Sequence, residues 1–345
     1  WINLFATSLK EKGRAALVMA NSASDARHSE ADIRKTLIEN NLIYAMLTLP
    51  SNMFYTVTLP ATLWFFDKDK KDDKILFIDV RNVFTQIDRA HREFTEEQIQ
   101  NIAVISRLHR GNRLEYLSLV NSYFIKGFKR LTENKPRLET VADKVTAFVK
   151  EYNGKDVPDF KPVLGQSGAL FQFYKNYEKS LDIAQIEKSN TEQRKLSDAV
   201  TPFFISLHEL IKELDKKVRH IEKEQSKNKD LKILKTELEE LHKEVKAAEY
   251  YFIHIRWLQE RFPDAKYEDV TGLCKLAGMD EIREQEYSLN PGRYVGVVIE
   301  EDGKTEEEFI EEMVFMHEEL EKLNAEAREL ESVISHNIRQ ITGEN

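Results

Sequence analysis

The sequence has few of the residues that interrupt regular secondary structure. Glycine occurs 12 times and proline 8 times in 345 residues. Because these two residues dominate turns, their scarcity predicts long elements, mainly helices. The sequence also has a single cysteine, Cys274. One cysteine excludes an intramolecular disulfide and a zinc site made of several cysteines, and it fits a reducing, cytoplasmic compartment.

The sequence also lacks an apolar run that suits a membrane span. Residues 40–66 are uncharged, but Pro50 and Pro60 fall inside this segment and would break a spanning helix. Two buried strands joined by a polar loop explain the segment better. No signal peptide is visible. Because the first residue is Trp rather than Met, we expect the chain to be a fragment of a longer protein.

Excess charge of one sign is absent from most of the chain. The net charge is −9, but residues 300–345 alone carry 15 acidic and 4 basic residues, so the remainder is close to neutral. Residues 107–137 have the opposite bias, with 8 basic and 2 acidic residues. Solvated helix faces would explain both runs. The apolar content of 41% is enough for a sizeable core and excludes a wholly disordered chain.

The first part of the chain alternates patterns of helix and strand. Apolar residues at helical spacing predict helices over 1–12 and 29–40, the second capped by Ser29 with Ile33, Leu37 and Ile38 facing inward. Short apolar runs predict strands over 14–20, 42–47, 59–66 and 74–80. This order predicts an α/β fold with a mainly parallel sheet covered on both faces. Some antiparallel pairing is expected among the last strands, because no helix separates them.

This segment is typical of the second half of a nucleotide- or cofactor-binding α/β domain. No two glycines in the sequence are separated by one residue, so a G-x-G phosphate or cofactor loop is absent. The nine histidines show no metal-ligand spacing with cysteine or acidic residues, and no metal site is predicted.

The loop Leu49–Pro60 is the most informative part of this segment. It leaves the carboxyl end of one predicted strand, where ligands bind in open α/β sheets. It presents two adjacent aromatic residues, Phe54 and Tyr55, beside Asn52 and two threonines. Such a pair could stack on a base extruded from a duplex. The alternative is that the two rings fill a gap in the core.

The middle of the chain is predicted to be helical. Thr95 and Gln98 form a capping pattern at its start. The basic run that follows is interleaved with aromatic residues, a pattern that indicates contact with a nucleic-acid backbone. The alternative is a surface whose cations pair with acidic residues from elsewhere in the chain. The candidate DNA-backbone contacts are Arg107, Arg110, Arg113, Lys126, Lys129 and Arg130.

Two heptad seams follow a predicted linker over Asn153–Gly168. Apolar residues repeat at spacings of three and four over 207–221 and again over 231–255, with the polar stretch Glu222–Asp230 between them. Two antiparallel helices joined by a polar turn, a hairpin near 203–258, explain both the gap and a change of register across it. One continuous helical rod is the alternative.

The last segment predicts a helix that pairs with a partner. Thr305 and Glu308 form a capping box. From Phe309 to Ile334 apolar residues keep a strict spacing of four and three. Because this apolar stripe is narrow, it suits a coiled-coil partner better than a broad globular core. Packing on this chain's own helices is the alternative.

Several motifs, in their order along the chain, resemble the methyltransferase (modification) subunit of type I restriction–modification systems. They comprise a glycine–strand–Ala-Asn opening, a helix with alternating charges, the aromatic loop with its two following strands, and the sequence YSLNPGRYV. These stretches are Gly13–Asn21, Glu30–Leu42, Leu49–Lys68, Ile75–Asp79 and Tyr287–Val295.

The resemblance implies an adenine-N6 DNA methyltransferase that uses S-adenosylmethionine. The implied fold is the second half of a Rossmann-like methyltransferase sheet (residues 1–95), a mainly helical region with the hairpin (96–268), and a C-terminal segment with a coiled-coil-type helix (269–345). The family's glycine-containing donor loop and its Asn-Pro-Pro-aromatic tetrad are both missing, and Asn290-Pro291-Gly292 is not that tetrad. We therefore assign no catalytic residue, and we expect the chain alone to be inactive and the cofactor to bind only the full-length protein.

The resemblance also implies partners and contact residues. Expected partners are DNA, a specificity subunit and a restriction subunit, with two modification subunits per complex and no membrane. Asn52, Phe54, Tyr55 and Thr58 match the family's loop near the target base. Expected subunit contacts are Arg293, Tyr294, Phe309, Met313, Met316, Leu320, Leu323 and Leu330. A helical scaffold and a nucleic-acid-binding module without catalysis are the alternatives.

Overall fold

The computed structural model describes residues 1–152, 161–224, 229–297 and 306–342. Residues 1–296 form one compact unit and residues 297–345 a second, and each is described by itself. None of the helices in these described ranges is both long and apolar enough to cross a membrane.

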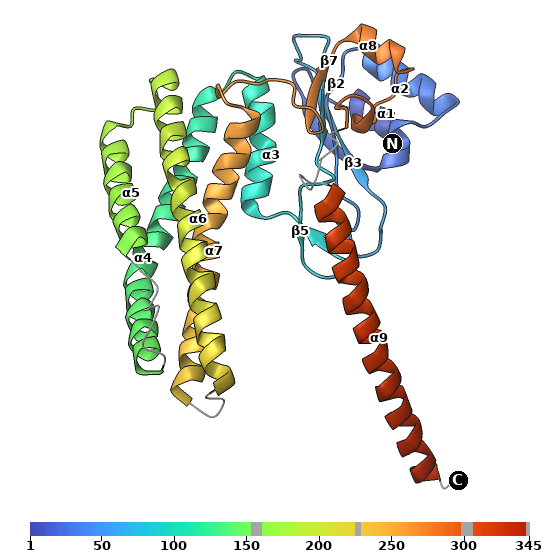
Figure 1. Cartoon of the computed structure of the whole chain (residues 1–345). Coiled ribbons are helices and arrows are strands. Elements are labelled where there is room, and N and C mark those ends of the chain that lie inside the picture. The colour runs from blue at the N-terminus through green and yellow to red at the C-terminus, as the bar shows by residue number, and fades with distance from the viewer. Residues whose placement is uncertain (153–160, 225–228, 298–305, 343–345) are drawn as a thin grey trace. The chain divides into compact units, whose positions relative to one another are not determined.

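The first unit joins a sheet to a group of long helices (Figure 1). Its helices are α1 (Ile2–Thr7), α2 (Ser29–Glu39), α3 (Glu96–His109), α4 (Arg113–Tyr152), α5 (Lys161–Ser180), α6 (Ile186–Glu224), α7 (Lys229–Arg261) and α8 (Met279–Glu284), with short 3-10 helices η1 (Asn21–Ser24) and η2 (Pro291–Arg293). Its strands are β1 (Arg14–Ala20), β2 (Ile43–Thr48), β3 (Ala61–Asp67), β4 (Ile75–Asp79), β5 (Thr85–Gln86), β6 (Arg92–Glu93) and β7 (Cys274–Ala277).

The main sheet has the order β1-β3-β2-β4-β7. Of the pairings between these strands, only β2–β4 is parallel, and β1–β3, β2–β3 and β4–β7 are antiparallel. The predicted mainly parallel sheet is therefore wrong. The reason is that β3 returns directly from β2 through a loop without a helix and lies between β1 and β2, so it runs against both neighbours. Because β1 and β2 both run against β3, the carboxyl ends of β1, β2 and β4 share one edge of the sheet.

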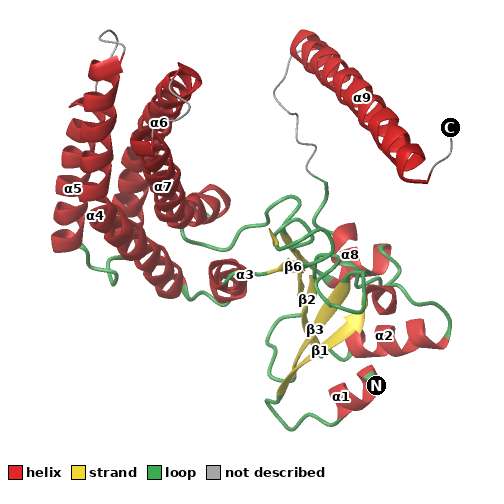
Figure 2. Cartoon of the chain, turned by 90° about the horizontal axis from the view of Figure 1, so that it is seen from below, coloured by secondary structure: helices red, strands yellow, loops and turns green. Residues whose placement is uncertain are grey.

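Alternate residues of the strands pack on opposite faces of this sheet. Helices α1, α2 and α8 cover one face (Figure 2), where Met46, Trp64 and Phe77 are almost completely buried. Leu47, Leu76 and Ile78 point to the other face and belong to the core that continues into the long helices. Every residue of β4 is buried, which explains its continuous apolar sequence.

The long helices α4 to α7 pack along one another (Figure 1). The residues of both heptad seams are buried, including Leu214 at 0% and Leu241 at 0% exposure. Helices α6 and α7 are antiparallel. His208 of α6 bonds Glu249 of α7, whereas the earlier residue Thr201 bonds the later residue Arg256. Most of the predicted turn Glu222–Asp230 is outside the described side chains, and residues 225–228 are outside the described backbone.

Three local predictions need correction. The backbone cap of α2 is His28, at a φ of 59° and without a side-chain bond, so Ser29 is not the cap, and Ile33 is 41% exposed rather than inward. Helix α5 begins at Lys161, so the predicted linker does not extend to Gly168, while residues 153–160 are outside the description. The strand β7 was not predicted, and its Cys274 is buried.

The second unit contains α9 (Glu306–Thr342). The predicted capping box lies outside the description, because Thr305 is not among the described residues and the side chain of Glu308 is not among the described side chains. The apolar residues of its seam that are described are about half exposed, for example Met313 at 49% and Leu323 at 58%. Among the described residues of this unit, the apolar side chains of the seam are therefore not buried against another element.

A substitution at Gly127 tests the packing of α4 on α7. A Cβ atom at Gly127 would lie 2.7 Å from two ring atoms of Phe252, which also contacts the rings of Phe128 and Phe204. We expect Gly127→Ala to lower the free energy of unfolding by about 1–3 kcal/mol through overpacking, although alanine is the better helix former. Urea denaturation measures this change.

The matched control is Gly168→Ala in α5, where an added Cβ meets nothing within 4 Å. It should stabilise the chain by up to about 1 kcal/mol through helix propensity alone. Equal stabilisation by both substitutions would contradict the described contact.

Candidate functional site

The loop Leu49–Pro60 lies at the sheet edge formed by the carboxyl ends of β1, β2 and β4. Its backbone is closed by a bond from Asn52 N to Thr58 O at 3.2 Å and one from Val57 N to Phe54 O at 3.3 Å. Asn52 has a φ of 61°, in the left-handed region that asparagine tolerates better than most residues. Phe54 is 41% and Tyr55 86% exposed. The two rings therefore do not fill a gap in the core, which was the alternative left open by the sequence.

The small hairpin of β5 and β6, residues 85–93, holds this loop from the side. Arg92 N donates to Asn52 O at 3.0 Å, and the Arg92 guanidinium donates to Ser51 Oγ at 2.9 Å and lies 3.9 Å from the centre of the Phe84 ring. At the hairpin turn His91 Nδ1 lies 2.6 Å from Asp88 Oδ2, and this hydrogen bond lowers the pKa of Asp88. The His91 ring is 4.9 Å from the Tyr55 ring.

A groove of about 900 Å³ opens between the sheet and α3. Its floor is apolar and includes Leu47, Leu63 and Phe65, and the loop residues Met53 and Phe54 form one end. Among the described residues that line the groove there is no Asp or Glu. A carboxylate is the usual acceptor for the ribose hydroxyls of a nucleoside cofactor, so the groove has no group of that kind.

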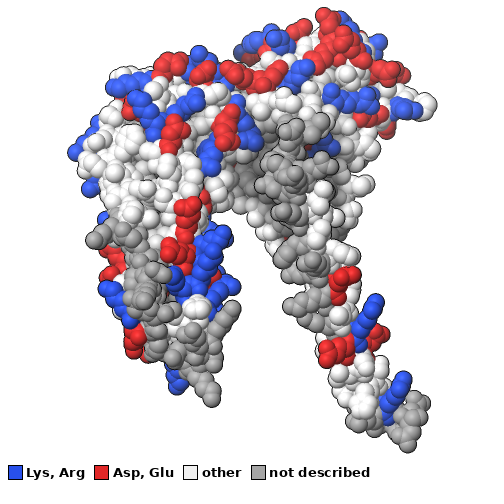
Figure 3. All heavy atoms as spheres, viewed as in Figure 1, with Lys and Arg blue, Asp and Glu red and all other residues white. Residues whose placement is uncertain are grey.

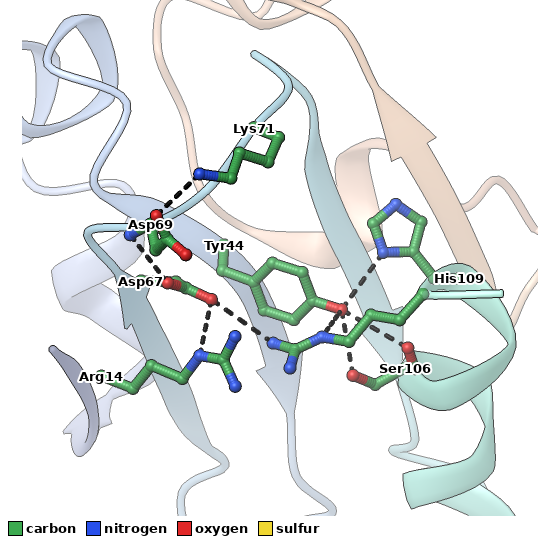
Figure 4. Close-up of polar contacts among 8 residues, drawn as sticks. Arg14, Tyr44, Asp67, Asp69, Lys71, Ser106 and His109 are labelled. Carbon is green, nitrogen blue, oxygen red and sulfur yellow. Dashed lines mark hydrogen bonds and ion pairs between the residues drawn. The ribbon is translucent and has the colours of Figure 1, made fainter. Parts of the chain in front are cut away.

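The other end of the groove is polar (Figure 4). The Tyr44 hydroxyl lies 3.0 Å from Ser106 Oγ and 3.1 Å from His109 Nδ1, and it accepts a bond from Arg110 Nε at 3.1 Å. Asp67 is almost completely buried. It accepts a bond from Arg14 Nε at 2.8 Å and forms an ion pair with Arg110 at 3.6 Å. Burial lowers the pKa of His109, which favours its neutral form. This network joins α3 to the ends of β1, β2 and β3.

The six candidate DNA-backbone cations all have acidic neighbours in the same chain. The pairs are Arg107–Glu115, Arg110–Asp67, Arg113–Glu187, Lys126–Glu97, Lys129–Glu133 and Arg130–Glu244, all within 4.0 Å. Basic and acidic side chains alternate over the visible face of the helical region (Figure 3). The interleaved Tyr116, Tyr123, Phe124 and Phe128 are buried in the core. This arrangement matches the alternative that the sequence left open, in which the cations pair with acidic residues of the chain.

The sequence Tyr287–Val295 packs back on the first segment of the chain. The Tyr294 ring stacks on Phe77 of β4 with a centroid distance of 3.8 Å, and its hydroxyl donates to Ser288 O. Asp25, which follows η1, accepts bonds from Ser288 and Asn290 and lies 3.5 Å from Arg293. Tyr294 is therefore buried inside the chain and is not available to a partner, whereas Arg293 is half exposed.

A known protein family matches most of this chain. The family model described as "N-6 DNA Methylase" matches residues 1–122 and 203–303, more than half of the chain. The chain belongs to the N-6 DNA methylase family. The matched residues include the loop Leu49–Pro60, the β5–β6 hairpin and the sequence Tyr287–Val295.

Individual relatives of this methylase chain are type I methylase subunits. The chain is 43% identical over 105 residues to the type I restriction enzyme MjaIX methylase subunit of Methanocaldococcus jannaschii, and 36% identical over 105 residues to the HindI methylase subunit of Haemophilus influenzae. Each match covers 30% of this chain but only 19% and 24% of the relatives. These matches confirm the resemblance inferred from the motifs, over a small part of the relatives' length.

Solved structures give a weaker likeness. A type I restriction-modification methyltransferase subunit from Streptococcus thermophilus is 26% identical over 29% of this chain and 21% of its own, with a TM-score of 0.28. This TM-score is too low to support any argument about the fold.

Sequence reasoning missed two groups of residues in the methylase chain. One is the Asp88–His91 pair, whose spacing of three residues in a short polar turn is a usable signal. The other is buried Arg34, which donates to Tyr287 O and Ala26 O and joins α2 to the motif Tyr287–Val295. No local pattern reveals the contact with Tyr287, because this residue is far from Arg34 in the sequence.

A substitution at Arg110 tests whether this cation of the basic run stabilises the fold. We expect Arg110→Met to lower the free energy of unfolding by about 1–3 kcal/mol, because Asp67 loses one of two cations and Tyr44 loses a charged donor. Arg107→Met is the matched control; its partner Glu115 is exposed, so the loss should be below about 1 kcal/mol. Urea denaturation compares the two, and equal small losses would argue against an internal role for Arg110.

Proposed function

We propose that this chain is part of the modification subunit of a type I restriction–modification enzyme, which transfers a methyl group from S-adenosylmethionine to adenine N6 in DNA. The family match and the type I methylase relatives support this proposal. The observation that carries it is the exposed aromatic pair Phe54–Tyr55, held at the sheet edge where ligands of α/β proteins bind.

The loop Leu49–Pro60 contacts the target base in this proposal. An adenine must leave the duplex before its amino group is accessible, and a flipped base is commonly stacked on aromatic side chains. Tyr55 and Phe54 present such surfaces, and Thr58 is exposed beside them. Asn52 contributes through its backbone, which closes the loop and accepts from Arg92.

We propose that the methyl donor binds the intact subunit outside the residues described for this chain. The groove has no carboxylate in its lining, and the sequence has neither a G-x-G loop nor an Asn-Pro-Pro-aromatic tetrad. Other parts of the intact subunit then hold the donor and the adenine amino group. The chain alone is then inactive.

DNA-backbone contact by the basic run is retained only for Lys129 and Arg130, which combine an exposed side chain with a long ion pair. Lys129 is 74% exposed at its side chain and Arg130 41%, and their ion pairs, at 4.0 and 3.7 Å, are loose enough to exchange for phosphate. The guanidinium of Arg113, by contrast, donates to Ala265 O and Asp264 O and is largely buried.

The helix α9 binds the specificity subunit in this proposal. Its half-exposed stripe includes Met313, Met316, Leu320, Leu323 and Leu330, and methionine gives such a surface adaptability; the side chain of Phe309 is outside the described ones. Coiled-coil pairing of this stripe, Arg293 as a further contact, two modification subunits and a restriction subunit complete the proposed cytoplasmic complex. The α6–α7 pair is proposed to act as a structural hairpin that packs on α4.

Tyr55→Ala tests the base contact. Stacking of a base on an aromatic side chain contributes about 1–3 kcal/mol, so the methylation rate of the intact enzyme should fall about 5- to 150-fold, as measured by transfer of radioactive methyl groups to DNA. Tyr55→Phe keeps the ring and should remain near the parent rate. Leu59→Ala, at an exposed aliphatic residue of the same loop, is the second control. Unchanged rates in both Tyr55→Ala and Phe54→Ala would refute the assignment.

Paired substitutions test the partner helix. Leu323→Asp with Leu330→Asp places two carboxylates on the apolar stripe of α9 and should abolish co-purification with the specificity subunit. Ala325→Asp with Ser332→Asp adds the same charge on the opposite side of the helix and should leave it intact. If both double variants retain the subunit, α9 does not bind through this stripe.

A further inference from the structure

We propose that His91, held by Asp88, is a positioning residue that sets the orientation of Tyr55 for stacking on an extruded purine. This inference rests on the proposed function of the loop Leu49–Pro60. It assigns to His91 the support of Tyr55, the more exposed of the two rings in that loop.

The contacts of the hairpin turn support this role. Asp88 Oδ1 accepts from Ala90 N at 2.8 Å and His91 N at 3.0 Å, while Asp88 Oδ2 is bonded to His91 Nδ1. One carboxylate therefore fixes both the backbone of the turn and the plane of the imidazole. A side chain bonded in this way loses little further freedom when it contacts a second ring.

Tyr55 has no comparable support from its own loop. Its side chain is 86% exposed, and its centroid lies 4.9 Å from that of His91 at an interplanar angle of 52°. This tilted contact leaves most of the Tyr55 ring open to a ligand while limiting the directions in which it points. A third ring can then stack on the open surface.

His91 can position Tyr55 only if the β5–β6 hairpin is fixed relative to the loop Leu49–Pro60, and the contacts of Arg92 fix it. Arg92, next to His91, bonds the backbone of Asn52 and the hydroxyl of Ser51, and its Nε donates to Gln86 Oε1 across the hairpin at 3.1 Å. The His91 ring is thus attached to the same loop that carries Tyr55, and a shift of one moves the other.

A double-mutant cycle in the intact enzyme tests the proposal. The probe is a DNA duplex that carries 2-aminopurine at the target adenine, whose fluorescence rises when the base leaves the stack, together with the methylation rate on unmodified DNA. We expect His91→Ala to reduce both signals about 3- to 10-fold. Because His91 acts through Tyr55, the double variant should be no worse than Tyr55→Ala alone.

Two further variants separate positioning from folding. His91→Phe keeps a ring against Tyr55 but loses the bond to Asp88, so it should restore only part of the extrusion signal. His208→Ala removes a similar histidine–carboxylate pair, His208–Glu249 at 2.7 Å, on α6 and α7, and should leave the signal unchanged. A cycle in which the two losses multiply would overturn the proposal.

The outcomes also distinguish this proposal from the function on which it rests. If Tyr55→Ala is defective and His91→Ala is not, only the role of His91 is refuted. If Tyr55→Ala is itself without effect, the stacking function of the loop fails, and the role of His91 fails with it.

Discussion

The antiparallel pairing of β7 with β4 is the interaction on which the arrangement of the site depends. It places Ile75 opposite Ala277 and Ile78 opposite Cys274, so the chain returns to the sheet after all of α3 to α7. Closing so long an excursion costs little more than closing a shorter one, since each doubling of length adds only about 0.6 kcal/mol. Because β7 is fixed there, the motif Tyr287–Val295 reaches the turn after β1 and the face of β4. Residues from the beginning and from the end of the first unit therefore support the sheet edge beside the loop Leu49–Pro60.

The parts of this fold that could be predicted are those encoded locally. The boundaries of β1 to β4 agree with the apolar runs to within two residues, and the capping box of Thr95 and Gln98 is present. The antiparallel pairing of β2 with β3 was predicted from the missing helix between them, whereas the insertion of β3 beside β1 was not, because no local pattern gives the order of strands in a sheet. The strand Cys274–Ala277 has too few residues for a recognisable alternation. Its burial comes from β4, which no local pattern indicates.

The candidate site was predictable in its composition but not in its exposure. The adjacent rings of Phe54 and Tyr55 are visible in the sequence, whereas only the structure shows that both face solvent. The basic run shows the opposite outcome. Its positive charge is obvious from the sequence, but several of its partners, such as Asp67 for Arg110 and Glu244 for Arg130, come from distant segments and alter what the charge can do. A count of local charge therefore overstates the cations that are free to bind a phosphate.

The order of the aromatic loop comes from its backbone rather than from its rings. Burying a large apolar side chain contributes roughly 1.5–3 kcal/mol, and the loop forgoes much of this at Phe54 and Tyr55. Its closure depends instead on the bonds of Asn52 with Thr58 and Arg92, which involve neither ring. A ligand can therefore take up the rings without unfolding the loop that presents them. Such separation of support from contact surface is what a stacking platform requires, because the free energy of stacking is then available for holding the base.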